Sequence, residues 1–305
     1  MTLSEEPEEA PRSNFRITVL MLRRQEFLTY LAAAIGTLTG LWLLETTLQW
    51  TVITSSGSSA LVGALYIAIF APMVILIVPV GIAIDRYGAK PLMLASQGIW
   101  CALMMSGAAF SHLGWMNAHV AIGLAVVDGT CTAMWTVPAQ VVLGRAVRKE
   151  LMPSAVGLGL LQFAVGRIIG GSLAGATLSA GPTTALLLGA ASATLGMAAA
   201  VRVHENRSFE RRSMAPPWPA EIGEALSWTV RNPPAVCLLI LGAITALFTL
   251  DYVTILPAIS RTVLHTGPSG LGQMAAAGGV GLAVGPSLQI RSDALLVAVP
   301  PSAWR

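Results

Sequence analysis

Long apolar stretches separated by short polar breaks run along most of this chain. Stretches of about 20 or more mostly apolar residues cover 27–53, 60–84, 91–110, 115–142, 154–178, 183–201, 235–258 and 270–288. A helix of this length can cross a bilayer, where lipid offers no partner to an unsatisfied backbone polar group. The pattern therefore predicts an all-α, polytopic membrane protein with about eight transmembrane helices.

The composition supports the membrane class and excludes two others. Of the 305 residues, 54% are apolar and only 11% are charged, and the mean hydropathy is +0.70. A soluble domain carries about 25% charged residues to cover its surface, so a water-soluble globule of this composition is excluded. The high apolar content also excludes a disordered chain.

The sequence contains no recognisable metal or nucleotide site. Cys101, Cys131 and Cys237 each lie inside an apolar stretch, without a CxxC pair or a His/Cys cluster, so neither a disulfide framework nor a structural metal is expected. The Gly-rich loop that binds nucleotide phosphates is also missing. We expect no cofactor and no nucleic acid partner; the expected partners are the lipid bilayer and a small-molecule substrate.

Basic residues gather in one alternating set of breaks. Most of the 18 lysines and arginines lie in the N-terminal arm or after the second, fourth and sixth stretches, namely Arg12, Arg16, Arg23, Arg24, Arg86, Lys90, Arg145, Arg148, Lys149, Arg202, Arg207, Arg211, Arg212 and Arg231. Only Arg261 lies in the opposite set of loops. Cytoplasmic loops carry the excess of basic residues, so we expect a multi-pass protein of the cell membrane with a cytoplasmic N-terminus.

The longest internal polar break divides the spans unequally. We expect a cytoplasmic arm over 1–26, a complete six-helix transmembrane bundle over 27–201, and a cytoplasmic linker over 202–234. Within the linker, Ile222, Ala225 and Leu226 fall on one helical face, which predicts an amphipathic helix along the membrane surface. The first two helices of a second bundle are expected over 235–288, followed by an atypical polar tail over 289–305.

A ten-residue motif lies between the second and third stretches. The sequence GIAIDRYGAK contains Gly81, Asp85, Arg86, Gly88 and Lys90. Gly81 is expected to let neighbouring helices approach, and Gly88 to take the left-handed conformation of a two-residue turn. Asp85 and Arg86 lie where a carboxylate can pair with a helix N-terminus or a basic side chain. Alternatively, the motif is a charged turn that only fixes topology.

This motif resembles the signature of the major facilitator superfamily, G-x-L-A-D-R-x-G-R-K, and lies between the same two spans. The resemblance implies two six-helix bundles that rock about a central site, with the motif as a conformational switch on the cytoplasmic side. Further segments resemble the drug and siderophore exporter branch of that family, the branch of macrolide-efflux and enterobactin exporters: 138–155, 167–175, 231–234, 256–258 and 270–272.

Ionisable residues inside apolar stretches are costly and need a reason, at about 2.5–3.5 kcal/mol for a charge at the bilayer centre. Asp128 and Arg167 lie near the middle of the fourth and fifth stretches, and we expect them to form a pair facing the bundle interior. The pair would line a transport path, relay a proton or simply join two helices. Glu45, with Gln49 one turn later, and Asp251 in the corresponding seventh stretch are further candidates for the transport path. For Glu45, the alternative is a side chain that extends to the outer interface.

Glycines recur along the fifth stretch. Gly166, Gly170, Gly171 and Gly175 form overlapping small-xxx-small pairs, which permit close backbone contact between membrane helices. Tight helix packing and a flexible rocking interface are both compatible with this spacing.

Three functions remain open from the sequence. The first is a secondary active transporter, similar to antiporters, which exports small amphipathic compounds by alternating access driven by protons or another ion gradient. The second is a truncated, non-transporting remnant or interaction module, because the resemblance implies twelve spans and a missing C-terminal half or second subunit. An intramembrane enzyme built on His265 and Ser269 is the minor alternative, since no accompanying acid or oxyanion arrangement is evident; we expect the protein not to be an enzyme.

Overall fold

The computed structural model describes residues 25–146, 152–202, 223, 227–245 and 252–297. Helices account for almost all of this part of the chain, and no strand occurs in it. The α-helices are α2 (Gln25–Ser56), α3 (Ser59–Tyr87), α4 (Ala89–His112), α5 (Ala118–Ala146), α6 (Met152–Thr177), α7 (Pro182–Arg202), α9 (Pro233–Thr245), α10 (Tyr252–Ala258) and α11 (Gly267–Val297). A 3₁₀ turn, Leu178–Ala180, follows α6, and a π-helical turn, Ile259–Val263, follows α10.

Six described helices are long and apolar enough to cross a membrane. The qualifying segments are Leu31–Ser56, Ser59–Tyr87, Ala89–His112, Ala118–Val142, Gly159–Ala180 and Pro182–Arg202. They coincide with the first six stretches of the sequence pattern, so the all-helical, membrane-spanning architecture is confirmed. The total of about eight spans stays a prediction.

The region after the linker departs from the expected boundaries. The seventh stretch holds α9 and α10, with residues 246–251 outside the described part, and α9 contributes only a short apolar helix, Pro233–Gly242. The eighth stretch lies within α11, which begins at Gly267 and continues to Val297. The expected boundary at 288 therefore falls inside a helix, because the polar residues that follow do not interrupt helical geometry. Of the expected linker helix, residues 227–231 are described and helical.

Local side chains set several helix starts. The Ser58 hydroxyl accepts a hydrogen bond from the Leu61 backbone N–H (3.4 Å) at the start of α3. The Asn117 side-chain oxygen accepts from the backbone N–H groups of His119 (3.0 Å) and Val120 (3.1 Å). These N-caps satisfy backbone donors that have no partner within the helix. The Asn117 cap explains why α5 begins at Ala118 rather than at residue 115.

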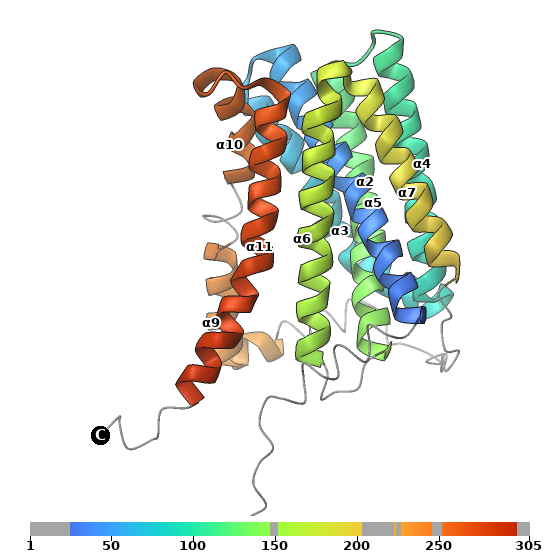
Figure 1. Ribbon diagram of the computed structural model, residues 1–305. Coiled ribbons are helices and arrows are strands. Elements are labelled where there is room, and N and C mark those ends of the chain that lie inside the picture. The colour runs from blue at the N-terminus through green and yellow to red at the C-terminus, as the bar shows by residue number, and fades with distance from the viewer. Residues whose placement is uncertain (1–24, 147–151, 203–222, 224–226, 246–251, 298–305) are drawn as a thin grey trace, which may run out of the picture.

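Helix α2 lies at the centre of the six-helix bundle α2–α7. It packs against α3, α5, α6 and α7, and Figure 1 shows it enclosed by those helices. Close approach depends on glycine at two positions of α2, since a methyl group on Gly36 would lie 3.1 Å from Gly196 and one on Gly40 would lie 2.9 Å from the Gly189 carbonyl. Helices α10 and α11 lie along one side of this bundle, and α9 stands apart from it (Figure 1).

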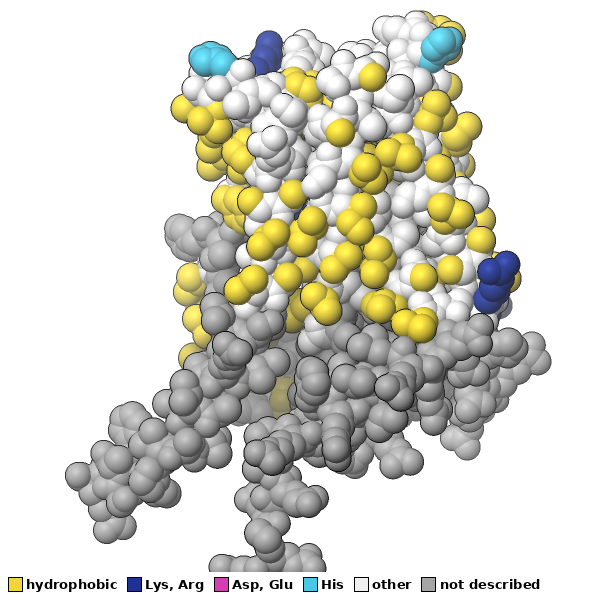
Figure 2. All heavy atoms as spheres, viewed as in Figure 1, with side chains coloured by type: hydrophobic (Ala, Val, Ile, Leu, Met, Phe, Trp, Pro, Cys, Tyr) yellow, Lys and Arg dark blue, Asp and Glu magenta, His cyan; other side chains and the backbone are white. Residues whose placement is uncertain are grey.

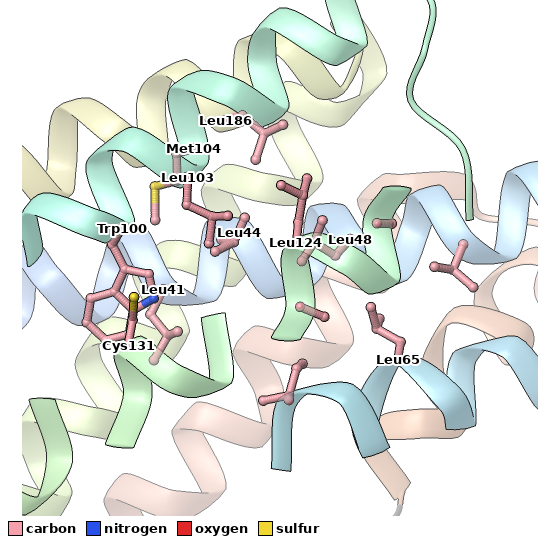
Figure 3. Packing of buried hydrophobic residues seen from close by; sticks show 14 of the residues in the cluster. Leu41, Leu44, Leu48, Leu65, Trp100, Leu103, Met104, Leu124, Cys131 and Leu186 are labelled. Atoms are coloured by element: carbon pink, nitrogen blue, oxygen red, sulfur yellow. The ribbon is translucent and has the colours of Figure 1, made fainter. Parts of the chain in front are cut away.

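The buried core joins all of these inner helices. Leu44 and Leu48 from α2 meet Trp100 and Met104 from α4 and Leu186 from α7, as Figure 3 shows from close by. These side chains are fully buried. Dispersion contacts at native packing density therefore hold the bundle around α2.

The outer surface is apolar as well. On α3, Ile67, Val74 and Ile75 are 68–70% exposed. In Figure 2 hydrophobic side chains cover the wall of α6, α7 and α11, while basic and histidine side chains gather mainly at its two ends. An apolar wall between polar ends is the surface that a bilayer covers.

Candidate transport site

The sequence motif forms a one-residue turn between α3 and α4. Gly88 ends α3 with its N–H bonded to the Ile84 carbonyl (2.8 Å) and also precedes α4. Its backbone has φ 91° and ψ 160°, a region that essentially only glycine occupies. The expected left-handed conformation is correct only in the sign of φ, since ψ is 160°. The expected two-residue turn is wrong, because Gly88 alone joins the two helices.

Lys90 ties this turn to a distant helix end. Its ammonium donates a hydrogen bond to the Val201 carbonyl (2.9 Å), near the end of α7. The last carbonyls of a helix have no intrahelical partner and carry partial negative charge, so a lysine there is stabilising. The contact also places the second and sixth polar breaks at the same end of the molecule, which we call the Lys90 end.

The other motif residues make fewer contacts. Asp85 and Arg86 are exposed, and the Arg86 guanidinium lies 5.3 Å from the centre of the Tyr87 ring. No hydrogen bond or ion pair of Asp85 is found within the described residues. A methyl group on Gly81 would meet no atom within 4 Å, so the close helix contact expected at Gly81 is not made there.

Arg167 is buried near the middle of α6 and is held by aromatic rings. Its guanidinium carbon lies 4.6 Å from the centre of the Trp42 ring and 5.6 Å from that of Tyr252. Its Nη2 donates a hydrogen bond to the Tyr252 hydroxyl (2.9 Å). Arg167 thus joins α6 to α2 and to α10, which lies beyond the six-helix bundle.

Asp128 has a different partner from the expected one. It is fully buried on α5, and its Oδ1 accepts a hydrogen bond from the Trp100 indole N–H (2.7 Å) on α4. Its Oδ2 has no partner. The expected Asp128–Arg167 pair is therefore wrong: similar depth did bring both residues into the interior, but each side chain faces a different neighbour.

Glu45 interacts electrostatically with both of these buried residues, Asp128 and Arg167. It lies on α2 and is half-buried. Gln49, one turn later, is buried and lies near the Tyr66 hydroxyl, which itself makes no hydrogen bond of normal geometry. Of the expected path residues, the structure gathers Glu45, Gln49, Asp128 and Arg167 around α2. Asp251 lies outside the described residues.

Several polar atoms in this interior have no hydrogen-bond partner. They are Trp42 Nε1, Tyr66 Oη, Gln97 Oε1, Asp128 Oδ2, Trp135 Nε1 and Arg167 Nε. Buried polar groups are normally paired, and each exception calls for an explanation. A concentration of unpartnered donors and acceptors around ionisable side chains is the arrangement expected where a polar ligand or ion binds. We call this set, with Glu45, Gln49, Trp100 and Tyr252, the central polar cluster.

The glycines of α6 face two different helices. Methyl groups on Gly166 and Gly170 would lie 2.5 Å from Leu38 Cβ and 2.7 Å from Trp42 Cβ, both on α2. A methyl on Gly171 would lie 3.0 Å from Ala275 Cβ on α11, and Gly175 is in similar contact with Gly272. Close packing is thus confirmed at these four positions, and the third and fourth glycines serve the contact with α11.

Sequence reasoning missed the aromatic and cross-bundle partners of these residues. Trp42, Trp100 and Tyr252 are distant in sequence from the charges they contact, and apolar stretches give no sign of which way an indole faces. From the sequence, Arg261 is recognisable only as a lone basic residue in its loop. It donates to the Ile53 carbonyl near the end of α2, so it joins the π-helical turn to the six-helix bundle at the end opposite Lys90, called the Arg261 end.

The comparison with known families agrees with this architecture. The family model described as Major Facilitator Superfamily matches residues 30–299. With most of its length matched, the chain belongs to this superfamily. No curated protein and no solved structure matches the chain significantly. Membership defines the class: a multi-pass membrane protein of the secondary transporter type, a family of transporters and not of enzymes.

Proposed function

We propose that this protein is a secondary active transporter that exports small amphipathic compounds across the cell membrane by alternating access, driven by an ion gradient. The observation that carries the proposal is the central polar cluster. Its charged residues lie within apolar helices, where each is costly, and its unpartnered atoms mean that folding alone does not satisfy them. In transporters, sites near the bilayer midplane between helix bundles hold such groups.

Protons are the proposed coupling ion. Glu45 and Asp128 are carboxyl groups, which take up and release protons, and Asp128 keeps one oxygen unpartnered. Because Glu45 interacts with both Asp128 and Arg167, protonation of one group alters the field at the others. A gradient can drive a conformational change only if the ion binds the two states with different affinity.

Contacts at the two ends support alternating access. At the Arg261 end, Arg261 joins the π-helical turn to α2. At the Lys90 end, Asp85 and Arg86 are exposed, and α9 stands apart from the bundle (Figure 1). We propose that the Lys90 end is cytoplasmic, as the basic residues indicate, and that this arrangement is the one closed to the outside.

The test is uptake driven by a pH gradient in proteoliposomes that contain the full chain. A panel of fluorescent amphipathic anions, cations and neutral compounds would be offered, and accumulation followed with and without a protonophore. We expect at least one compound to accumulate only while the gradient is present. Asp128→Asn should abolish the gradient-dependent part, while Trp100→Phe, which removes the hydrogen bond to Asp128 together with part of the indole ring, should reduce it. Gradient-independent or absent accumulation of every compound would contradict the proposal.

A further inference from the structure

The feature that the transport role leaves unexplained is the manner in which Arg167 is held. We propose that Arg167 and Trp42 form a subsite for an oxyanion of the transported compound, a carboxylate on a flat apolar body. This inference rests on the proposed transport role, since it names the substrate class of the same cluster.

The first argument is the absence of an ion pair at Arg167 within the described residues. Arg167 is only 6% exposed, and a buried cation normally requires a partner of opposite charge. Among the described residues its hydrogen-bond acceptor is the neutral Tyr252 hydroxyl. Asp128 is hydrogen-bonded instead to Trp100. Glu45 interacts electrostatically with Arg167 but forms no ion pair with it. Within the described residues no carboxylate forms an ion pair with Arg167, so its guanidinium can accept an external anion.

The second argument is the pair of free donors. The Trp42 indole N–H and the Arg167 Nε–H are both buried and unpartnered. The Arg167 guanidinium carbon lies 4.6 Å from the Trp42 ring centre, so the two side chains that carry these donors are neighbours. Stacking occupies the faces of a guanidinium and leaves its edge N–H groups for a planar acceptor. A carboxylate supplies two acceptor oxygens in one plane, which suits the edge of a guanidinium.

The third argument is the apolar surface beside the donors. The Trp42 ring packs edge-on against Phe163, with ring centres 5.4 Å apart, and the Tyr252 ring centre lies 5.6 Å from the Arg167 guanidinium carbon. Gly278 of α11 lies against the same atoms, since a methyl group there would be 3.0 Å from Arg167 Nη2 and 2.6 Å from the Tyr252 hydroxyl. The subsite is thus where α2, α6, α10 and α11 meet, and aromatic walls favour a flat apolar body.

Binding of three matched probes tests the charge preference. The probes are 2-naphthoate, 2-naphthylmethylammonium and 2-naphthalenemethanol, which share one ring system and differ in charge. Equilibrium dialysis against the full chain in nanodiscs, with empty nanodiscs as the blank, gives each affinity from naphthyl fluorescence. We expect 2-naphthoate to bind at least about tenfold more tightly than the other two, the ratio that one charge-assisted hydrogen bond supplies.

Three variants assign the preference to these side chains. Arg167→Gln should remove the anion preference, and Arg167→Lys should retain part of it, because a lysine keeps the charge but not the planar edge. Trp42→Phe keeps a smaller aromatic ring and loses the N–H, so it should weaken 2-naphthoate several-fold with a smaller effect on the alcohol. Arg231→Gln is the matched control, an exposed arginine outside the central polar cluster, and should change none of the three affinities.

Each outcome decides one question. Equal binding of the three probes, a preference for the ammonium, no binding of any probe, or an intact anion preference in Arg167→Gln would overturn the subsite. Size-exclusion profiles and circular dichroism establish that each variant is folded before it is compared. Anion preference without gradient-driven uptake would contradict the transport role alone, whereas uptake without anion preference would contradict the subsite alone.

Discussion

At the scale of single residues, two features stand out: a backbone conformation that requires glycine, and charged side chains buried among apolar helices. Gly88 is the clearest case, because one residue with φ 91° and ψ 160° connects two membrane-length helices. Asp128 and Arg167 are another, since each lies within apolar helices with an uncharged aromatic partner. Only glycine avoids backbone strain at position 88. Neither Asp128 nor Arg167 forms an ion pair within the described residues.

Gly88→Ala should destabilise the protein, because a side chain disfavours this backbone region by about 1–3 kcal/mol. Thermal unfolding in detergent, followed by tryptophan fluorescence, measures the effect. Gly81→Ala is the matched control, within the same motif but inside α3 and with no atom within 4 Å of the added methyl; it should unfold at the same temperature as the parent or slightly above. Equal destabilisation by both substitutions would show that the turn geometry is not what requires glycine.

The residue scale is also where prediction from sequence reached its limit. The positive φ of Gly88 followed from its place between two helices, and the burial of Asp128 and Arg167 from their apolar surroundings. Their pairing did not follow, because depth in the membrane is set by position along a helix, whereas contacts depend on the rotation of each helix about its axis. That rotation is decided by packing with α4 and α10, which a single sequence does not encode locally.

At the scale of elements, α6 has two packing faces with different roles. Gly166 and Gly170 bring it against α2 within the six-helix bundle, while Gly171 and Gly175 bring it against α11. The first contact holds the bundle together, and under the proposed function we expect the second to be the surface on which α11 moves. Close backbone approach lets such a surface shift without interlocked side chains.

Substitutions on the two faces should therefore have separate effects. Gly170→Ala puts a methyl group 2.6 Å from the Thr39 carbonyl and should lower the unfolding temperature in detergent. Gly171→Ala meets Ala275 Cβ at 3.0 Å, and should slow gradient-driven uptake with a smaller effect on unfolding. The control, Gly157→Ala, lies on α6 with nothing within 4 Å and should change neither. Loss of stability without loss of transport at Gly171 would contradict the assignment of that face.

Element boundaries were predictable where local chemistry sets them. The first six stretches matched described helices because apolar length and capping residues such as Ser58 determine both ends. The end of α11 was not predicted, since its polar continuation after 288 retains helical geometry to Val297. Apolar composition therefore predicts which segments are long enough to cross a bilayer. It does not predict where α11 ends, because that helix continues past its apolar stretch.

At the scale of the whole molecule, membership in the Major Facilitator Superfamily and the apolar outer wall define a multi-pass membrane protein. The central polar cluster lies inside it, and cross-bundle contacts are made at the Arg261 end. In the proposed cycle the two ends open alternately around the cluster. A hydrogen bond from Arg261 to the end of α2 must then break when the Arg261 end opens.

The most direct test of this cycle is the distance between spin labels at the two ends. One pair joins Ser56 at the end of α2 to Val263 of the π-helical turn, and the other joins Tyr87 at the end of α3 to Val230; all four side chains are exposed. Cysteines would replace these residues, in a background without Cys101, Cys131 and Cys237 that retains uptake. When pH is lowered or 2-naphthoate is added, we predict opposite changes, with the Ser56–Val263 distance lengthening as the Tyr87–Val230 distance shortens. If neither the Ser56–Val263 distance nor the Tyr87–Val230 distance changed under any of these conditions, the proposed cycle would be contradicted.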